Sequence, residues 1–160
     1  MRAVAVVLTV AACNASGAQN GDDAAVDASL VSGTDAPPMP ADAIPLAARD
    51  PVLLVHGING SANDFSTLID RLVADGWQRE RLFAYTFADP SWGCNVDNAE
   101  AIRDTVDDIL TSTGAAKVTV VAHSMGTLSS RYFIKNLGGA DHLNTYLTLG
   151  GMHHGLLSSC

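Results

Sequence analysis

The sequence predicts an α/β fold in which a mostly parallel sheet lies between two layers of helices. Four short apolar runs begin near residues 52, 82, 118 and 146, and each has the length of a strand. Between them lie stretches with apolar residues at helical spacing. The runs recur at intervals of roughly 30 residues, which is the length of a βαβ unit with its crossover helix.

The expected strands are continuous apolar runs rather than alternating ones, as in a sheet covered on both faces. They comprise residues 52–55, 82–87, 118–122 and 146–149. The first helix carries apolar residues at 65, 68, 69, 72 and 73, with Ser61 and Asp64 as a capping box and Gly76 as its stop. The second helix carries a stripe from 99 to 110 and closes at Gly114, and the third covers residues 125–136.

Length and charge limit the class of protein. The chain has 160 residues, of which 48% are hydrophobic, and a net charge of −8. An acidic chain of this kind lacks the clustered Lys and Arg that nucleic-acid binding requires. No apolar run reaches the roughly 18 residues of a membrane span. We divide the chain into an apolar segment 1–12, an acidic segment 13–50 and a domain over 51–160.

The first twelve residues predict an export signal. Arg2 precedes an apolar stretch, and Val10–Cys13 (VAAC) resembles the lipobox of bacterial lipoproteins. The resemblance implies cleavage before Cys13, lipidation of Cys13, and attachment to a membrane through that lipid alone. Asn14 stands where an inner-membrane retention signal has Asp, which favours an outer-membrane or cell-surface location. The alternatives are an ordinary cleaved signal, giving a secreted or periplasmic protein, and a frayed apolar N-terminus.

Residues 13–50 have the composition of a flexible tether. They are rich in Ala, Asp and Pro, contain no aromatic residue, and oppose six Asp with the single base Arg49. Such a segment buries too little apolar surface to offset its chain entropy, and its like charges repel each other.

The third expected strand leads directly into Ala122–Gly126 (AHSMG), which the third helix follows. A tight strand-to-helix turn forces its central residue into a strained backbone conformation and lifts that side chain above the sheet. Small residues two positions on either side let strand and helix approach closely. Ser124 is therefore the candidate nucleophile. The first strand ends in His56–Gly60 (HGING), whose glycines allow the loop to turn its amides inward.

Five segments together resemble the small secreted bacterial lipases of the α/β-hydrolase superfamily known as lipase class 2. They are VLLVHGING at 52–60, DGW at 75–77, AHSMG at 122–126, YFIKNLGG at 132–139 and TLGG at 148–151. The resemblance implies an α/β-hydrolase fold and hydrolysis of carboxylic esters, often lipids, through an acyl intermediate on Ser124. It also implies an oxyanion hole made by the backbone N–H groups of Ile58 and Met125, with no cofactor and no metal.

The general acid and base of such an enzyme are not identifiable in the sequence. The family places the triad Asp or Glu, and then His, after strands that follow the nucleophile. Beyond Ser124 the chain offers one acid, Asp141, and the histidines 142, 153 and 154. We expect Asp141 and His142 in a surface loop at the end of the sheet away from the elbow. His153 and His154 follow the last strand and are expected to line the cleft.

His56 and His123 occupy motif positions beside the cleft, where we expect packing or hydrogen bonding rather than catalysis. The alternatives are a substitute base from His153 or His154, and a zinc site, which no ligand spacing supports. With four strands, residues 51–160 are expected to form the N-terminal part of an α/β-hydrolase domain. We therefore expect this chain alone to be inactive on esters, with its last strand as a bare apolar edge.

Cysteine usage fits an exported protein. If Cys13 is lipidated, Cys94 and Cys160 remain as an even pair and a disulfide candidate in an oxidising compartment. The alternative is that Cys160 pairs with a cysteine beyond the present sequence.

Two functions are consistent with these observations. The first is a carboxylic ester hydrolase that acts on an ester or lipid substrate through Ser124. The second is a surface-tethered, non-catalytic binding module on a degenerate hydrolase scaffold, because the acid and base are not found.

Overall fold

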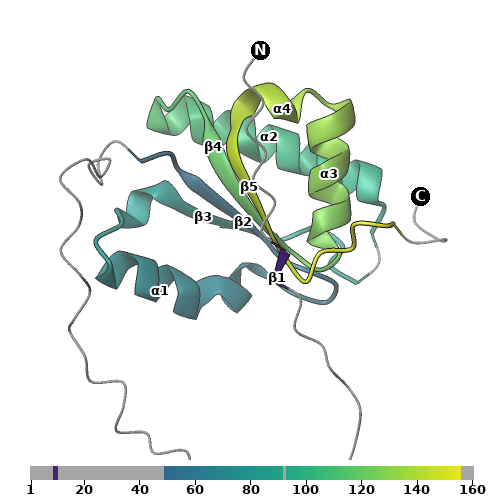
Figure 1. Cartoon of the computed structure of the whole chain (residues 1–160), viewed down its shortest axis with the longest axis horizontal. Coiled ribbons are helices and arrows are strands. Elements are labelled where there is room, and N and C mark those ends of the chain that lie inside the picture. The colour runs from purple at the N-terminus through teal and green to yellow at the C-terminus, as the bar shows by residue number, and fades with distance from the viewer. Residues whose placement is uncertain (1–8, 11–48, 92, 156–160) are drawn as a thin grey trace, which may run out of the picture.

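The computed structural model describes residues 9–10, 49–91 and 93–155 (Figure 1). The predicted signal segment 1–12, apart from two residues, and the lipidation candidate Cys13 lie outside the described residues. So do nearly all of the predicted tether 13–50 and the disulfide candidate Cys160. Within the described part, no helix is both long and apolar enough to cross a bilayer.

The described chain forms one parallel sheet with the strand order β1-β5-β4-β2-β3. The strands are β1 (Thr9–Val10), β2 (Val52–Val55), β3 (Leu82–Tyr85), β4 (Val118–His123) and β5 (Leu143–Leu149). The two central strands, β4 and β2, pair in register from Val52 opposite Thr119 to Val55 opposite Ala122. The predicted α/β fold with a parallel sheet is confirmed.

Helices cover both faces of this sheet, with α1 on one side and α2 and α3 on the other (Figure 1). The helices are η3 (Ala62–Phe65), α1 (Ser66–Ala74), η4 (Arg79–Arg81), α2 (Asn95–Thr113), α3 (Gly126–Asn136) and α4 (Gly139–His142). The predicted capping box forms: the Asn63 N–H donates to Ser61 Oγ, and the Ser61 N–H donates to Asp64 Oδ2. It caps η3, which leads directly into α1.

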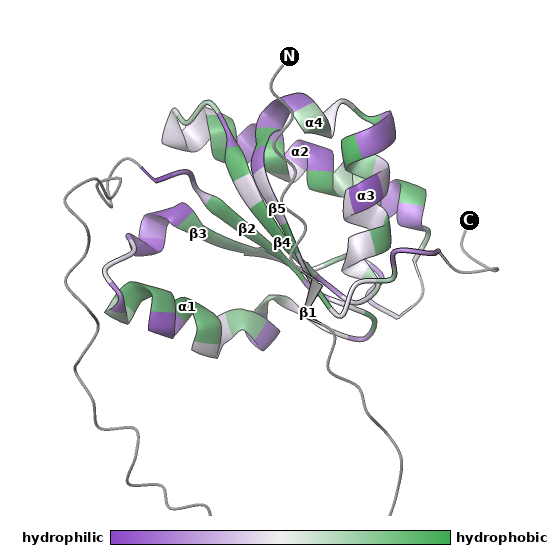
Figure 2. Ribbon diagram, in the orientation of Figure 1, coloured by the Kyte–Doolittle hydropathy of each residue, from purple (hydrophilic) through white to green (hydrophobic). Residues whose placement is uncertain are grey.

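β2 is hydrophobic along its whole length and β4 is hydrophobic from Val120 to Ala122, as Figure 2 shows, because both faces of these stretches are buried. Leu53, Val55 and Val120 pack with Ile102, Val106 and Phe133 of α2 and α3. Val52, Leu54 and Val121 face the other way, towards Phe65 and Ile69 beside and within α1. This arrangement explains the continuous apolar runs in the sequence.

Two predicted strand boundaries and one predicted loop are wrong. β3 ends at Tyr85 rather than residue 87, because the Phe87 N–H donates to the ring of His56 instead of continuing a strand. β5 begins at Leu143 rather than Tyr146, because its pairing with β4 extends back to Val118. Asp141 and His142 lie in the short helix α4 rather than in a loop.

The last strand, β5, was expected to have an unpaired edge, but its C-terminal end is paired. Thr9 and Val10 pair in parallel with Thr148 and Leu149, on the side of β5 away from β4. These two residues belong to the segment that we interpret as an export signal. Cleavage of that signal would remove β1 and leave this edge of β5 without it.

Candidate functional site

Ser124 occupies a sharp turn between the end of β4 and the start of α3. Its φ is 50°, in the left-handed region that a non-glycine residue adopts only at a cost. The turn is held on both sides: the Ser124 N–H donates to the Leu149 carbonyl at 3.0 Å, and the Ser124 carbonyl accepts from the Thr127 N–H at 3.0 Å. Ser124 is half-buried at the carboxyl end of the sheet. This is the strained, fixed geometry of a nucleophile elbow.

Two glycines allow the elbow to contact the loop that follows β2. A Cβ on Gly126 would overlap the carbonyl oxygen of His56, so helix α3 reaches the backbone of β2 only without a side chain there. A Cβ on Gly57 would lie 2.8 Å from the Cβ of Ser124. The loop after β2 and the candidate nucleophile are therefore in direct contact.

The backbone amides of this loop differ in what they bind. The Asn59 N–H donates to the Pro90 carbonyl at 2.7 Å, and the Gly60 N–H donates to the Gly57 carbonyl at 3.2 Å. For Ile58 and Met125, the described part of the chain supplies no hydrogen-bond acceptor to the amide. These two N–H groups are thus available to a bound oxyanion beside Ser124.

His56 is a structural residue beneath the loop. Its side chain is fully buried, its Nε2 accepts from the Phe87 N–H at 3.1 Å, and its Nδ1 donates to the Gly57 carbonyl at 2.6 Å. The ring also meets the edge of Phe87, with centroids 4.8 Å apart. Both ring nitrogens are occupied, so His56 supports the loop and has no free nitrogen for a substrate.

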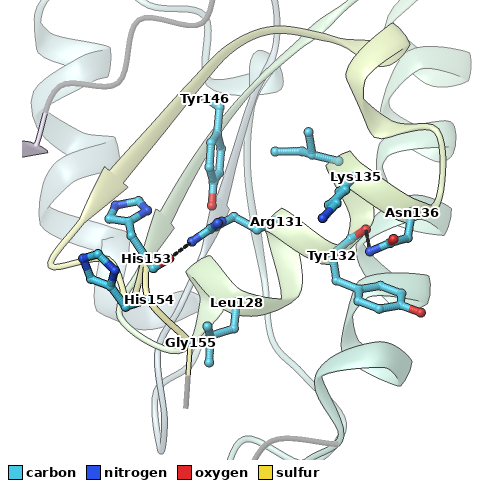
Figure 3. A pocket seen from close by; sticks show the side chains of 10 residues that line it. Leu128, Arg131, Tyr132, Lys135, Asn136, Tyr146, His153, His154 and Gly155 are labelled. Atoms are coloured by element: carbon cyan, nitrogen blue, oxygen red, sulfur yellow. Dashed lines mark hydrogen bonds between the residues drawn. The ribbon is translucent and has the colours of Figure 1, made fainter. Parts of the chain in front are cut away.

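The other predicted histidines lie at the same end of the sheet but in different surroundings. His123 is the exposed last residue of β4, and its Nδ1 lies close to Gly57. His153 Nε2 bonds to the Thr148 hydroxyl at 3.0 Å, and its carbonyl accepts from Arg131 (Figure 3). His154 is exposed.

His153 and His154 line a hollow of about 630 Å³ beside α3 (Figure 3). Its other walls come from α3, including Arg131, and from Tyr146 of β5. Ser124 does not line this hollow. Among the described residues, no group of three or more His, Cys, Asp or Glu side chains is close enough to hold a metal ion.

Tyr146 is the titratable group of this hollow with a perturbed pKa. Burial raises the pKa of its phenol above the usual value of about 10, and the nearby charge of Arg131 offsets part of that rise. The phenol donates to the Thr127 carbonyl at 3.2 Å, which connects β5 to the first turn of α3.

Alkaline pH is expected to destabilise the protein through Tyr146. A folded-state pKa above the unfolded value keeps this stability intact below about pH 10 and removes it as the pH rises further. In Tyr146→Phe, the melting temperature is expected to fall less between about pH 9.5 and 11 than in wild type. At pH 7 the variant should lose about 1 kcal/mol of folding stability, because the hydrogen bond of the phenol is gone. Thermal melts at both ends of this pH range measure the effect, and Tyr132→Phe, on the exposed side of α3, is the control. An equal slope in Tyr146→Phe and wild type would contradict the assignment.

The described residues do not place an acid and a base beside Ser124. Asp141 and His142 precede β5, whereas Ser124 follows β4, and the two strands are parallel. They therefore lie at opposite ends of the sheet. His153, which follows β5 at the same end of the sheet as Ser124, uses its Nε2 on Thr148.

Sequence reasoning missed the segment Asp89–Asn95, whose described residues, 89–91 and 93–95, touch both halves of the site. Pro90 binds the loop after β2, and Asn95 Oδ1 accepts from the hydroxyl of Ser129 in α3 at 2.7 Å. The Asp-Pro-Ser sequence at 89–91 is typical of a turn and could have predicted one here. It does not predict which loop the turn contacts.

Cys94, in this segment, is disulfide-bonded. The chain has only two other cysteines, Cys13 and Cys160, and both lie outside the described residues. The predicted partner, Cys160, therefore stays a prediction.

The parallel sheet, the strained serine between β4 and α3, and the contact of that serine with the loop after β2 define an α/β-hydrolase fold. The sequence profile described as Lipase (class 2) matches residues 49–155. The chain belongs to the class 2 lipase family.

Solved structures agree with this fold. The chain is similar to lipase BlEst2 of Bacillus licheniformis in its mature form, with 23% identity and a TM-score of 0.60, over 68% of this chain and 43% of that one. It is similar to the propeptide form of the same lipase with 23% identity and a TM-score of 0.59, over 68% of this chain and 23% of that one. This chain therefore spans less than half the length of either structure.

Proposed function

We propose that this chain carries the nucleophile and the oxyanion hole of a serine-dependent carboxylic ester hydrolase. The observation that supports the proposal most is the contact between Ser124, at a φ of 50°, and the loop that holds the free Ile58 amide. Membership of a lipase family indicates an ester or lipid as substrate.

In the proposed reaction, Ser124 Oγ attacks the ester carbonyl carbon and its proton passes to a general base. The carbonyl oxygen becomes an oxyanion, which the N–H groups of Ile58 and Met125 stabilise. Collapse of this intermediate expels the alcohol, protonated by the base, and leaves an acyl group on Ser124. Water activated by the same base then releases the carboxylic acid and restores Ser124. No step needs a cofactor.

The base is proposed to come from outside the described residues. His56 is buried with both nitrogens bonded, and His153 Nε2 is bonded to Thr148. A serine hydroxyl without a base is a weak nucleophile, because its alkoxide forms only far above neutral pH. We therefore expect residues 49–155 alone to hydrolyse esters at a negligible rate.

Covalent labelling of the complete gene product tests this proposal. A fluorophosphonate probe should phosphonylate Ser124, and peptide mass spectrometry should locate the adduct on the peptide containing residues 122–126. Ser130, a buried serine of α3, provides the control: Ser130→Ala should leave the labelling intact. A preparation that hydrolyses esters but carries no label on Ser124 would refute the nucleophile.

The second candidate is a non-catalytic binding module. The observation in its favour is that His56 and His153, two of the described histidines at this end of the sheet, already use ring nitrogens in hydrogen bonds to other residues. The same labelling experiment separates the two functions, because a binding module without a base should bind an ester without reacting with the probe.

A further inference from the structure

The segment Asp89–Asn95 lies between the two elements that supply the candidate oxyanion amides. At one end, the Pro90 carbonyl accepts from the Asn59 N–H at 2.7 Å, one residue beyond Ile58. At the other end, Asn95 Oδ1 accepts from the buried Ser129 hydroxyl at 2.7 Å, in the helix that begins beside Met125. The loop after β2 and helix α3 are thus connected through a third segment.

Asn59 is the residue through which this segment acts on the loop. Its φ of 56° places it in the left-handed region, which Asn tolerates better than most residues but still adopts at a cost. Asn59 is exposed to solvent, so burial does not stabilise its left-handed conformation. Two backbone bonds do: the Gly60 N–H closes the turn onto the Gly57 carbonyl, and the Asn59 N–H donates to Pro90, which orients the peptide between Ile58 and Asn59.

Asp89 shapes the turn that presents the Pro90 carbonyl. Its Oδ1 accepts from the Ser91 N–H at 3.0 Å and from the Ser91 hydroxyl at 2.6 Å, so the carboxylate closes a ring around Pro90. Gly93 completes the turn, because a Cβ there would lie 2.9 Å from the Asp89 carbonyl.

The far end of the segment leads into helix α2. Cys94 is disulfide-bonded, and its carbonyl accepts from the Asn98 N–H at 2.9 Å at the start of α2. The turn closed by Asp89 therefore holds the Pro90 carbonyl towards the Asn59 N–H.

We propose that Asp89 is a positioning residue for the ester hydrolase reaction: through Pro90 and Asn59 it fixes the Ile58 amide in the oxyanion hole. This inference rests on the proposed function. In this proposal Asp89 acts through Pro90 and Asn59 and not by contact with the substrate. Its removal should impair the transition state, where the oxyanion exists, and leave ground-state substrate binding almost unchanged.

The test uses Asp89→Ala in the complete gene product, with Asp89→Asn as the conservative variant. Asn keeps an oxygen that accepts from Ser91, so it should restore the wild-type values. Asp104→Ala is the matched control, because Asp104 is an exposed carboxylate of α2 whose side chain, among the described residues, bonds to Arg103 alone. Melting temperatures confirm that all variants are folded.

Two measurements are expected to change together. In Asp89→Ala, hydrogen exchange at the Asn59 amide should become about tenfold faster, because its acceptor is no longer held. For a short-chain aryl ester, kcat should fall about tenfold while KM stays within about twofold, since small misplacement of a catalytic group costs this much or more. Asp89→Asn and Asp104→Ala should match wild type in both.

The outcomes separate this inference from the proposed function. An active wild type whose Asn59 exchange or kcat is unaltered in Asp89→Ala would overturn the positioning role alone. A fall in kcat with an equal rise in KM, or one that Asp89→Asn does not rescue, would also overturn it. A wild type without turnover and without a label on Ser124 would overturn the proposed function and the oxyanion role with it.

Discussion

Replacement of Ser124 by alanine is expected to reduce kcat/KM for a short-chain aryl ester by at least about 10⁴-fold in the complete gene product. Without Oγ no acyl intermediate forms, and the amides of Ile58 and Met125 can stabilise only direct attack by water. The measurement is initial-rate hydrolysis, with active sites of the wild type counted by phosphonate titration.

The same position provides a control for folding. A φ of 50° is costly for any side chain, so Ser124→Gly should be as inactive as Ser124→Ala but more stable than wild type by about 1 kcal/mol. Loss of activity together with a gain in melting temperature separates chemistry from unfolding. Substantial hydrolysis by Ser124→Ala would exclude Ser124 as the nucleophile and make another residue of the protein responsible.

The fold was predictable because local pattern and tertiary packing agree. A strand that is buried on both faces must be apolar throughout, and Val52–Val55 with no exposed position gives that pattern. The boundaries at Tyr85 and Leu143 were not predictable, because they depend on long-range partners. Phe87 leaves the strand pattern to bond to His56, and polar Asn144 belongs to β5 because β4 lies beside it.

The candidate site was predictable where a motif constrains the backbone. Ser124 and Gly126 carry a geometric requirement that the sequence expresses directly, a strained turn and a close approach. The contact of Pro90 with Asn59 leaves no pattern in the sequence, because every residue has a backbone carbonyl that can accept a hydrogen bond. The role of Asp89 is visible only when the two loops are seen together.

Gly126→Ala is expected to have the largest effect on stability, about 3 kcal/mol. The added methyl group would overlap the His56 carbonyl and lie 3.0 Å from Val55 Cγ1, so helix α3 has to move away from β2. Such a shift also displaces the Met125 amide, which belongs to the same turn. We therefore expect ester hydrolysis to fall even at temperatures where the variant is folded.

Gly114→Ala measures the backbone strain of replacing a glycine in this fold, without the steric overlap expected at Gly126. Gly114 has a φ of 66° with open space around its Cα, so alanine there should cost only the strain of the left-handed conformation, about 1 kcal/mol, and leave hydrolysis unchanged. Urea unfolding of both variants gives the two free energies. If Gly126→Ala lost no more stability than Gly114→Ala, the contact between α3 and β2 would not be the tight one that positions the Met125 amide beside Ser124.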